Sequence, residues 1–284
     1  MVVKKFIILT SLLLATVSTF AQTGAYALYE YDAASYVAEY NRREVRSIAS
    51  ITKLFTANTV LLSGVDLNEK IIVNGRSRGH VPQGAYMSRI DLLRAMIISS
   101  DNRAAESLAN SHPGGFSKFM IDTNQYVDNH ALFNTHLVDS TGLLSGNVST
   151  ASDLVEFLHQ IKDNPIIKQI SHERTAVLNA PKGKRTIQIN LRNTNPDLFV
   201  YDNILITKTG FTNPAGRCVL MLVEKNKELF AVVVLGQKNV KNRSQVVNRL
   251  LNVEIPPLPI SKIITTIEFN YENSVRRDIR ILGE

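Results

Sequence analysis

Cysteine is almost absent from this sequence of 284 residues, and the single example is Cys218. One cysteine cannot form a disulfide within the chain, so the fold must be stabilised by its hydrophobic core. Because Cys218 stands directly before an apolar run, residues 219–223, we expect it to be a small buried hydrophobe and not a reactive thiol.

Several other features are missing, and each absence argues against a class of protein. Low-complexity tracts, internal repeats and heptad patterns are lacking, and a composition of 44% hydrophobic and 20% charged residues is ordinary for a globular protein. The histidines are scattered, with no pair at positions i and i+4 beside a carboxylate, so we expect neither a metal nor another cofactor. The net charge is +7, but the sequence contains no dense cluster of basic and aromatic residues, so nucleic acid is not an expected partner.

The chain begins with a segment that is typical of a secretory signal peptide. Lys4 and Lys5 precede an apolar run, residues 6–17, and small residues follow it. The run is too short to span a bilayer comfortably, although an uncleaved N-terminal anchor is the alternative. No cysteine follows the run, which argues against a lipoprotein. We therefore expect residues 1–21 to be removed and the mature chain to begin at Gln22.

Strands are predicted at both ends of the chain, with helices between them. Apolar and β-branched runs predict two strands within residues 27–40 and one strand each at 204–209, 217–224 and 229–235. Helical patterns cover residues 51–63, most of the stretch from 91 to about 170, and 240–251. These elements predict an α+β domain over residues 22–253, in which one antiparallel sheet joins N- and C-terminal strands around an inserted helical region. A proline-rich linker and a short tail, residues 254–284, follow.

Three short motifs occur in a fixed order, and they are Ser50-Ile51-Thr52-Lys53, Ser100-Asp101-Asn102 and Lys208-Thr209-Gly210. They are predicted at a helix start, in a loop before a helix, and at the end of a strand. Each motif alone has an ordinary structural reading, as a helix cap, a surface charge or a turn. Their joint occurrence in this order is not expected by chance, and it is the set used by serine acyl-transfer enzymes whose base is a lysine.

Ser50 and Lys53 are three residues apart, which places both side chains on one face at the first turn of a helix. A serine hydroxyl is a poor nucleophile until a base removes its proton, and an ordinary lysine, with a pKa of ~10.4, is protonated at neutral pH. Burial lowers a lysine pKa by up to ~3–5 units, and a second cation, for which Lys208 is the candidate, acts in the same direction. The pattern therefore predicts a buried Lys53 that activates Ser50.

The other two motifs fit the remaining tasks of such a site. Ser100 is the candidate proton relay between Lys53 and the leaving group, and the Asn102 amide is the candidate for holding the substrate backbone. A strand edge at Lys208 and Thr209 can pair with an extended peptide while the two side chains bind its carboxylate.

The motifs and their surroundings resemble the low-molecular-mass penicillin-binding proteins, the serine D-alanyl-D-alanine peptidases of family S11. Residues 46–54 are similar to the family's nucleophile segment, and residues 139–143 with 147–151 are similar to its mid-domain loop. Residues 208–218 most resemble the branch of the penicillin-binding protein 7 type, whose members are D-alanyl-D-alanine endopeptidases. The resemblance extends from residue 27 to residue 251.

This resemblance implies the β-lactamase/DD-peptidase-like fold and an acyl-enzyme mechanism without a cofactor. It implies that Ser50 is the nucleophile, Lys53 the base and Ser100 the relay. Substrate contacts are implied for four residues, namely Asn102, Lys208, Thr209 and Gly210. The implied oxyanion hole consists of two backbone N–H groups, those of Ser50 and Phe211.

The implied substrate is peptidoglycan, whose D-Ala-containing peptide cross-links an endopeptidase would open in the periplasm. The implied partners are peptidoglycan stem peptides and β-lactam inhibitors, and we expect a monomer whose membrane contact is at most peripheral. The first alternative is a D-alanyl-D-alanine carboxypeptidase that trims pentapeptide stems. That branch usually adds a β-rich domain and an amphipathic membrane helix, which residues 260–284 are too short to supply in full.

Two further alternatives are less favoured. A β-lactamase of class A needs a glutamate for fast deacylation, and Thr175 stands at that position before Leu178-Asn179. A non-catalytic module that binds or senses the wall would usually have lost a motif residue, and every motif residue is present.

Overall fold

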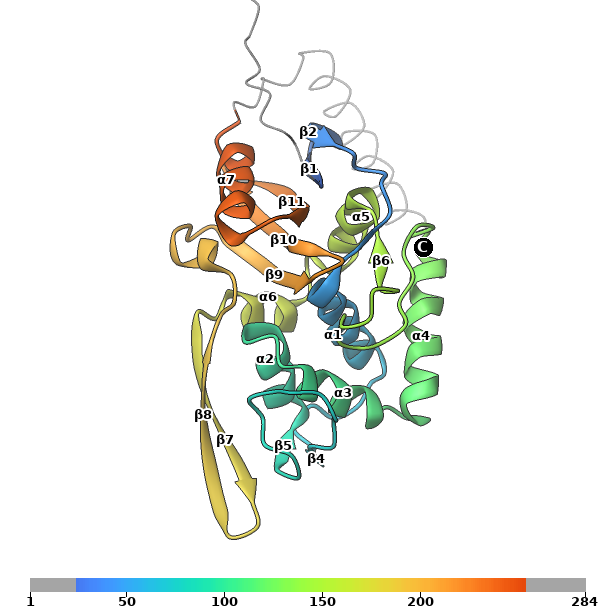
Figure 1. Ribbon diagram of the computed structural model, residues 1–284, viewed down its shortest axis with the longest axis vertical. Helices are drawn as coiled ribbons and strands as arrows, with labels where there is room; N and C mark the ends of the chain where they lie inside the picture. Colours follow the sequence, from blue (N-terminus) through green and yellow to red (C-terminus); the bar gives the residue numbers. More distant parts are fainter. Residues whose placement is uncertain (1–23, 254–284) are drawn as a thin grey trace, which may run out of the picture.

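A five-stranded antiparallel sheet forms one part of the computed structural model, which describes residues 24–253 (Figure 1). Its strands, in spatial order, are β2 (Ser35–Tyr40), β1 (Ala25–Glu30), β11 (Glu228–Gln237), β10 (Gly216–Lys225) and β9 (Ile204–Thr212). The N-terminal strand β1 pairs with β11, from near the end of the domain, and this confirms the prediction of a sheet built from both ends. The predicted signal peptide and C-terminal tail lie outside the described residues.

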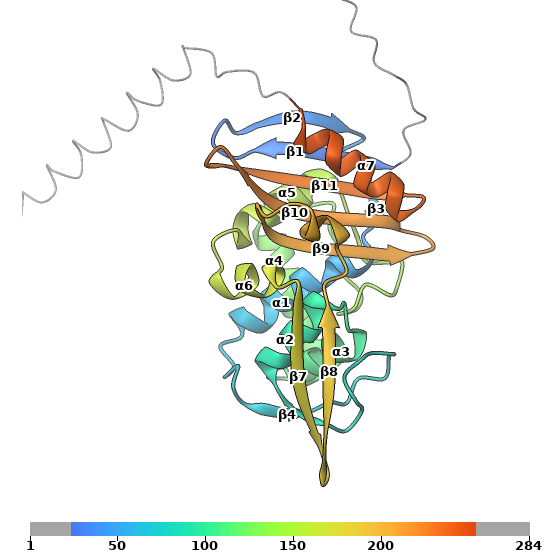
Figure 2. The same cartoon turned by 90° about the vertical axis from the view of Figure 1, so that its left-hand side faces the viewer.

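Both faces of the sheet are buried, because residues along a strand alternate between two hydrophobic clusters. In β10, Leu220 and Leu222 belong to the main cluster, which the inserted helices complete. The residues between and beside them, Val219, Met221 and Val223, belong to a second cluster under α7 (Val240–Leu251). Figures 1 and 2 show α7 on one face of the sheet and α5 (Ala151–Ile161) on the other. The strands therefore read in the sequence as continuous apolar runs.

The inserted region supplies the other helices, and besides α5 they are α1 (Thr52–Leu62), α2 (Arg89–Ile98), α3 (Asn102–Asn110), α4 (Gly115–Asn129) and α6 (Pro165–His172). Of these, α5 and α6 pack on the sheet. Helix α1 is the central one, and every residue from Thr52 to Val60 is buried, as the all-round apolar pattern predicted. Phe55 of α1 stacks on Phe157 of α5 with ring centroids 3.6 Å apart. The predicted helical stretch from 91 to about 170 is interrupted by a long non-helical segment between α4 and α5, which is held by side-chain to backbone hydrogen bonds.

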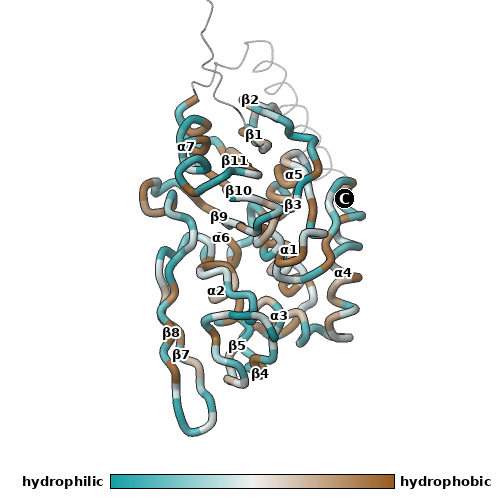
Figure 3. The backbone as a smooth tube through the Cα atoms, viewed as in Figure 1, coloured by the Kyte–Doolittle hydropathy of each residue, from teal (hydrophilic) through white to brown (hydrophobic). Residues whose placement is uncertain are grey.

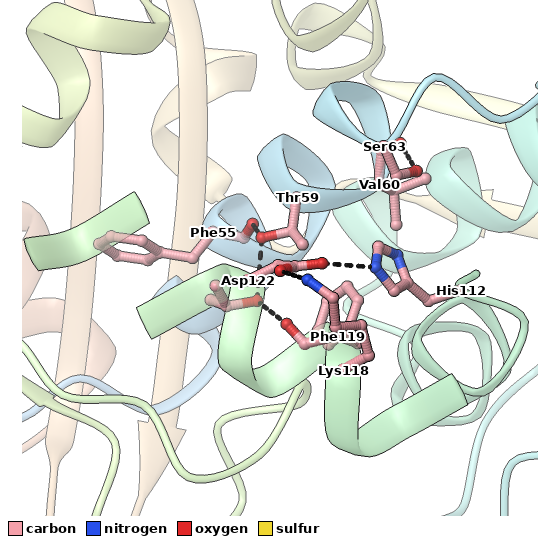
Figure 4. Close-up of polar contacts among 9 residues, drawn as sticks. Phe55, Thr59, Val60, Ser63, His112, Lys118, Phe119 and Asp122 are labelled. Carbon is pink, nitrogen blue, oxygen red and sulfur yellow. Dashed lines mark hydrogen bonds and ion pairs between the residues drawn. The ribbon is translucent and has the colours of Figure 1, made fainter. Parts of the chain in front are cut away.

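Polar contacts fasten the C-terminal half of α1 to α4 (Figure 4). Thr59 Oγ1 lies 2.9 Å from Thr123 Oγ1. On the same helix Asp122 pairs with Lys118, and its Oδ2 lies 2.9 Å from Nε2 of His112. The other end of α1 continues from a short 3-10 helix, η1 (Ala49–Ile51), which packs on β9. The first turn of α1 is therefore the end that meets the sheet.

Strands β7 (Thr175–Lys182) and β8 (Arg185–Arg192) form a long hairpin that projects from the body of the molecule, and the sequence analysis did not predict it (Figures 1 and 2). Ala176, Leu178 and Ala180 are buried while their neighbours in β7 are more exposed, so a period-two pattern was present. Two alanines made that signal weak. Beside it lies a smaller hairpin of β4 (Lys70–Ile72) and β5 (Tyr86–Ser88), and β3 (Arg46–Ser47) pairs with β6 (Val148–Ser149).

Cys218 is fully buried in β10, and burial raises the pKa of its thiol to about 11. The prediction of a buried cysteine is confirmed, and the raised pKa disfavours the thiolate, which is the reactive form. Figure 3 shows the hydropathy of the described residues, with hydrophobic segments in the sheet and hydrophilic ones at the tip of the β7–β8 hairpin. Within residues 24–253 no helix combines the length and the apolar character needed to cross a membrane.

Candidate active site

Ser50 and Lys53 lie where η1 passes into α1, at the end of the central helix that meets the sheet. Nζ of Lys53 is 3.0 Å from Oγ of Ser50. The same nitrogen donates to Oδ1 of Asn102 at 2.7 Å and to the carbonyl oxygen of Thr141 at 2.5 Å. Lys53 is fully buried, so these protein groups take the place of water around its amine. The structure thus brings together the first motif and one residue of the second.

Burial lowers the pKa of the Lys53 amine to about 7. Three carboxylates act in the opposite direction, and they belong to Asp139, Asp101 and Glu106. A large fraction of Lys53 is therefore uncharged near neutral pH, which is the form that can accept a proton from Ser50. Burial is the largest cause of this shift. Lys53 and Lys208 also repel each other, which lowers the pKa of Lys208, and because repulsion between like charges is mutual it disfavours the charged form of Lys53 as well.

The second motif lies at the N-terminus of α3. Asp101 caps this helix by accepting a hydrogen bond from the backbone N–H of Ala104 at 2.8 Å. Ser100 is therefore not the cap, and its backbone has a left-handed φ of 60°, which is uncommon for a residue with a side chain. Its hydroxyl oxygen accepts from Nζ of Lys208 at 3.0 Å. The conformation directs Ser100 toward the third motif and Asn102 toward the first.

The third motif lies in the middle of β9, and not at the end of the strand as we predicted. Strand β9 pairs with β10 as far as Thr212, because Gly216, with a φ of 66°, turns the chain directly back. Within residues 24–253, strand β9 is also the last strand of its sheet, so one of its edges has no strand beside it. Such an edge can accept an extended peptide through backbone hydrogen bonds.

Lys208 is buried on β9, and its Nζ donates to the Thr209 carbonyl oxygen at 2.9 Å as well as to Ser100. Burial lowers the pKa of Lys208 well below its usual value, and the charges of Lys53 and Arg243 lower it further. The Thr209 hydroxyl lies 2.7 Å from the hydroxyl of a second threonine at position 194. The amine of the third motif is therefore held by Ser100 and the hydroxyl of the motif by Thr194.

Two glycines allow the backbone to close around Ser50. A Cβ on Gly210 would lie 2.9 Å from the backbone nitrogen of Ser50, closer than real Cβ contacts. A Cβ on Gly142 would lie 1.9 Å from the carbonyl oxygen of Ala49. Strand β9 and the loop that contains Gly142 therefore approach the serine from two sides. The Ser50 amide consequently lies beside the part of β9 where Phe211 follows Gly210.

Comparison with known proteins places this geometry in a family. Residues 15–239 match the sequence profile of peptidase S11, described as D-alanyl-D-alanine carboxypeptidase. The chain belongs to this family. The D-alanyl-D-alanine endopeptidase of Escherichia coli strain K12 is 40% identical over 200 residues, which cover 67% of this chain and 64% of that protein. The corresponding endopeptidase of Pseudomonas aeruginosa is 39% identical over 198 residues, with 66% and 63% covered. The aligned part thus spans slightly less than two thirds of the length of these relatives.

Solved structures share the fold of this S11 protein. The Streptomyces K15 DD-transpeptidase superposes with a TM-score of 0.76 at 23% identity, and the alignment covers 82% of this chain and 97% of that chain. Penicillin-binding protein D2 from Listeria monocytogenes, in its cefotaxime-bound form, has a TM-score of 0.71 at 24% identity and covers 81% of this chain and 95% of its own. The predicted α+β fold of the DD-peptidase type is therefore confirmed.

Asp139 is a residue of the S11 site that the sequence analysis did not single out. Its carboxylate accepts hydrogen bonds from three backbone N–H groups, those of Thr141, Gly142 and Leu144, at 2.6, 2.6 and 2.8 Å. Burial raises the pKa of the Asp139 carboxyl, but these bonds outweigh burial and hold it below its usual value. They fix the loop whose Thr141 carbonyl receives Lys53. An aspartate shortly before Thr-Gly is a turn pattern that could have indicated this role.

Arg243 on α7 is the second residue that was missed. It is buried, and its Nη2 lies 3.6 Å from Oδ2 of Asp197 and 3.4 Å from Oδ1 of Asn195. Asn195 in turn donates to the hydroxyl of Thr207 at 2.8 Å, directly before Lys208. The Arg243 charge is therefore linked through Asn195 and Thr207 to the strand segment that carries the third motif. A single arginine on a C-terminal helix carries no sequence signal of this kind, because only the packing of α7 on the sheet brings it there.

A second polar cluster, at the other end of α1, contains a serine, a histidine and an aspartate but is not arranged as a nucleophilic site. Ser63, His112 and Asp122 line a cavity of about 120 Å³. The Ser63 hydroxyl donates to the Val60 carbonyl oxygen at 2.7 Å, while His112 pairs with Asp122 (Figure 4). In the part of the chain that the structure describes, no group of three or more histidine, cysteine, aspartate or glutamate side chains is arranged to hold a metal ion.

Proposed function

We propose that this S11 protein is a serine-type DD-peptidase that opens D-Ala-containing peptide cross-links of peptidoglycan through an acyl-enzyme on Ser50. The observation that carries the proposal is a buried Lys53 amine, with a pKa of about 7, at 3.0 Å from the Ser50 hydroxyl oxygen. A serine nucleophile needs a base in that position and state of protonation. The relatives at 40% and 39% identity are named D-alanyl-D-alanine endopeptidases, which favours that activity over a carboxypeptidase.

In the proposed acylation, Oγ of Ser50 attacks the carbonyl carbon of a D-Ala residue and Nζ of Lys53 takes the hydroxyl proton. The carbonyl oxygen becomes negative and accepts from the backbone N–H groups of Ser50 and Phe211, an interaction worth ~3–4 kcal/mol per donor in other enzymes. The intermediate then collapses and the peptide bond breaks. Lys53 returns the proton through Ser100 to the leaving amine, and water subsequently hydrolyses the ester on Ser50.

Substrate binding is proposed on the free edge of β9 and on the side chains around it. Oδ1 of Asn102 accepts from Lys53, which leaves its Nδ2 to donate to a substrate carbonyl. The backbone of Gly210 lies on the strand edge to which the extended peptide would add. Lys208 and Thr209 would bind a carboxylate of the substrate, and the arriving negative charge raises the pKa of Lys208 and favours its charged form.

We further propose the organisation of the whole chain. Residues 1–21 are a signal peptide, residues 22–253 are the catalytic domain, and residues 254–284 are a linker and tail. The basic start, the apolar run and the small residues that follow support the first assignment. The protein then acts in the periplasm as a monomer, with membrane contact that is at most peripheral, and β-lactams inhibit it by acylating Ser50.

A digest of mixed substrates tests the activity. Purified protein is incubated with cross-linked muropeptide dimers and pentapeptide monomers together, and the products are read by mass spectrometry. We expect dimers to become monomers while pentapeptides keep their terminal D-Ala. Loss of D-Ala with intact dimers would make the protein a carboxypeptidase. The Ser50→Ala variant is the control, and turnover that survives this change would overturn the assignment of the nucleophile.

Reaction with penicillin distinguishes the proposal from a β-lactamase. Thr175, which stands where fast deacylation would need a glutamate, begins β7 and is exposed. We therefore expect a long-lived penicilloyl adduct on Ser50, seen as a mass increase of the intact protein. Rapid release of hydrolysed penicillin would contradict the proposal, and a folded protein that no β-lactam acylates would point to a non-catalytic module.

A further inference from the structure

The two exposed hairpins carry an unusual concentration of positive charge. Residues 70–88 and 175–192 together contain seven lysine and arginine residues and no aspartate or glutamate. Outside these two segments, the sequence has equal numbers of basic and acidic residues, so the whole excess of +7 resides in them. We call the seven side chains the basic hairpin surface, and they are Lys70, Arg76, Arg78, Lys182, Lys184, Arg185 and Arg192.

The seven cations are accessible to a partner, although Arg192 also stacks over the Phe199 ring, 4.2 Å from its centroid. All seven residues are exposed. Arg89, Arg94 and Arg174 pair with carboxylates, but none of the seven has a carboxylate oxygen of residues 24–253 within 4.0 Å. Uncompensated like charges repel one another and destabilise the fold slightly, so their concentration here has no structural benefit.

The two hairpins lie side by side and form one surface. Strand β5 packs against β7, and the views in Figures 1 and 2 agree on their proximity. A Cβ on Gly84, in the β4–β5 hairpin, would lie 3.9 Å from Cε of Lys182 at the tip of the β7–β8 hairpin. The tip is also the hydrophilic end of this region in Figure 3.

Both hairpins contact the candidate active site at their bases. The carboxylate of Asp101, beside Ser100, accepts from the backbone N–H of Val81 at 3.0 Å in the β4–β5 hairpin. Strand β8 leads back to Thr194, whose hydroxyl lies 2.7 Å from that of Thr209. Its eight residues span roughly 26 Å at ~3.3 Å per residue, so the tip lies far from Ser50. A single stem pentapeptide, at most ~18 Å when extended, is too short to bridge that separation.

We propose that the basic hairpin surface is a docking site for polymeric peptidoglycan, and that it binds the free carboxylates of stem peptides beyond the one that is cut. The proposal rests on the proposed function. We choose the wall polymer as the partner because the basic hairpin surface begins at the candidate active site and extends further than one substrate peptide can reach. Docking would raise the local concentration of cross-links at Ser50 without changing the chemical step.

The test compares two sets of charge removals. The tip variant carries Lys182→Gln, Lys184→Gln and Arg185→Gln, and a second variant carries Arg76→Gln and Arg78→Gln. The matched control carries three exposed lysines from the opposite end of the molecule, changed to glutamine at Lys227, Lys238 and Lys241. Each is made in the full chain, with Ser50→Ala added where binding to isolated sacculi is measured by co-sedimentation.

We expect the tip variant to bind sacculi about tenfold more weakly at low salt, and the control to bind as the parent does. The difference should vanish at 1 M salt, where the Debye length is ~3 Å. With Ser50 intact, the tip variant should digest sacculi more slowly and yet react with penicillin and soluble muropeptide dimers at the parental rate. The penicillin reaction also reports that each variant is folded.

Three results would overturn the docking proposal. Unchanged binding by both hairpin variants is the first, and equal weakening by the control, which would indicate a general charge effect, is the second. The third is tighter binding to vesicles of anionic phospholipid than to sacculi, if the tip variant loses vesicle binding as well. That result would show that the basic hairpin surface binds a membrane. If the parent protein reacts with neither penicillin nor muropeptides, the proposed function is wrong. Binding to sacculi can still be measured in that case, so the docking proposal is tested separately.

Discussion

The state of protonation of Lys53 controls the proposed reaction, and pH is the perturbation that tests it. Burial lowers the pKa of this amine from 10.5 to about 7. At pH 7 an unshifted lysine would be uncharged in roughly one molecule in 3,000, whereas the shifted one is uncharged in about one in two. The difference is about 1,500-fold in the population of uncharged base at neutral pH, a factor that corresponds to about 4 kcal/mol.

The expected dependence of the acylation rate on pH follows from the chemistry of the base. Below pH 7 Lys53 is protonated and cannot take the proton of Ser50, so the acylation rate should fall about tenfold for each pH unit. Above pH 7 the rate should level off. The assay is the second-order rate constant for acylation by a fluorescent penicillin between pH 5 and pH 10, with circular dichroism as the control for folding at each pH.

The same shift has a consequence for stability. The folded pKa of Lys53 lies below the unfolded value, so between pH 7 and pH 10.5 the unfolded chain binds more protons at this residue. The free energy of unfolding should therefore rise with pH in that window, and the cost of burying the amine is greatest below pH 7. Relative to Lys53→Met, the parent should gain about 1.4 kcal/mol per pH unit between pH 7.5 and pH 9.5 in urea unfolding.

Three outcomes would refute this reasoning. An acylation rate that still rises tenfold per unit up to pH 10 would show that the pKa of Lys53 is not lowered. A rate that is constant from pH 5 to pH 10 would show that Lys53 is not the base. A stability difference from Lys53→Met that does not change with pH would contradict the shift independently of catalysis.

Three further changes test other parts of the structure. Gly210→Ala puts a Cβ 2.9 Å from the backbone nitrogen of Ser50, so the backbone around the serine has to shift. Penicillin acylation should fall roughly hundredfold and the thermal stability should fall as well, whereas a parental rate would show that the close approach is not required. Phe157→Ala removes a stacked, fully buried ring and should cost about 3–5 kcal/mol in urea unfolding, and a loss below 1 kcal/mol would contradict the packing. Asp139→Asn removes a carboxylate that raises the pKa of Lys53, so the acid limb of the pH profile of acylation should move to lower pH. The same carboxylate holds the loop around Thr141, so the plateau rate should fall. An acid limb that does not move would exclude the electrostatic effect.

Local patterns were sufficient wherever neighbouring residues in the sequence decide the outcome. The spacing of Ser50 and Lys53 is set by the helical repeat alone, and the structure places them 3.0 Å apart. The apolar runs at residues 217–224 and 229–235 indicate buried strands, because a strand buried on both faces needs no polar alternation. The central helix was recognisable for the same reason, since a helix apolar on every side has to be surrounded.

Predictions failed where distant segments determine the result. The end of β9 was placed too early because a glycine usually marks a turn, whereas Gly210 is needed for close approach to the Ser50 backbone. The β7–β8 hairpin was missed because its inward side consists partly of alanine, which has weak strand preference, and β5 and α2 provide the surface on which it packs. Nothing near Arg243 in the sequence shows that α7 brings it behind Lys208.

The sequence by itself determined the chemical identity of the site, because three motifs of fixed composition and order limit which side chains are present. It also determined the two-ended sheet, since burial on both faces leaves a continuous apolar run. Only the tertiary structure decided the state of those groups. The pKa of Lys53, the left-handed backbone of Ser100 and the union of two basic hairpins into one surface all depend on groups far apart in the chain, and desolvation and charge interactions act through space and not along the sequence.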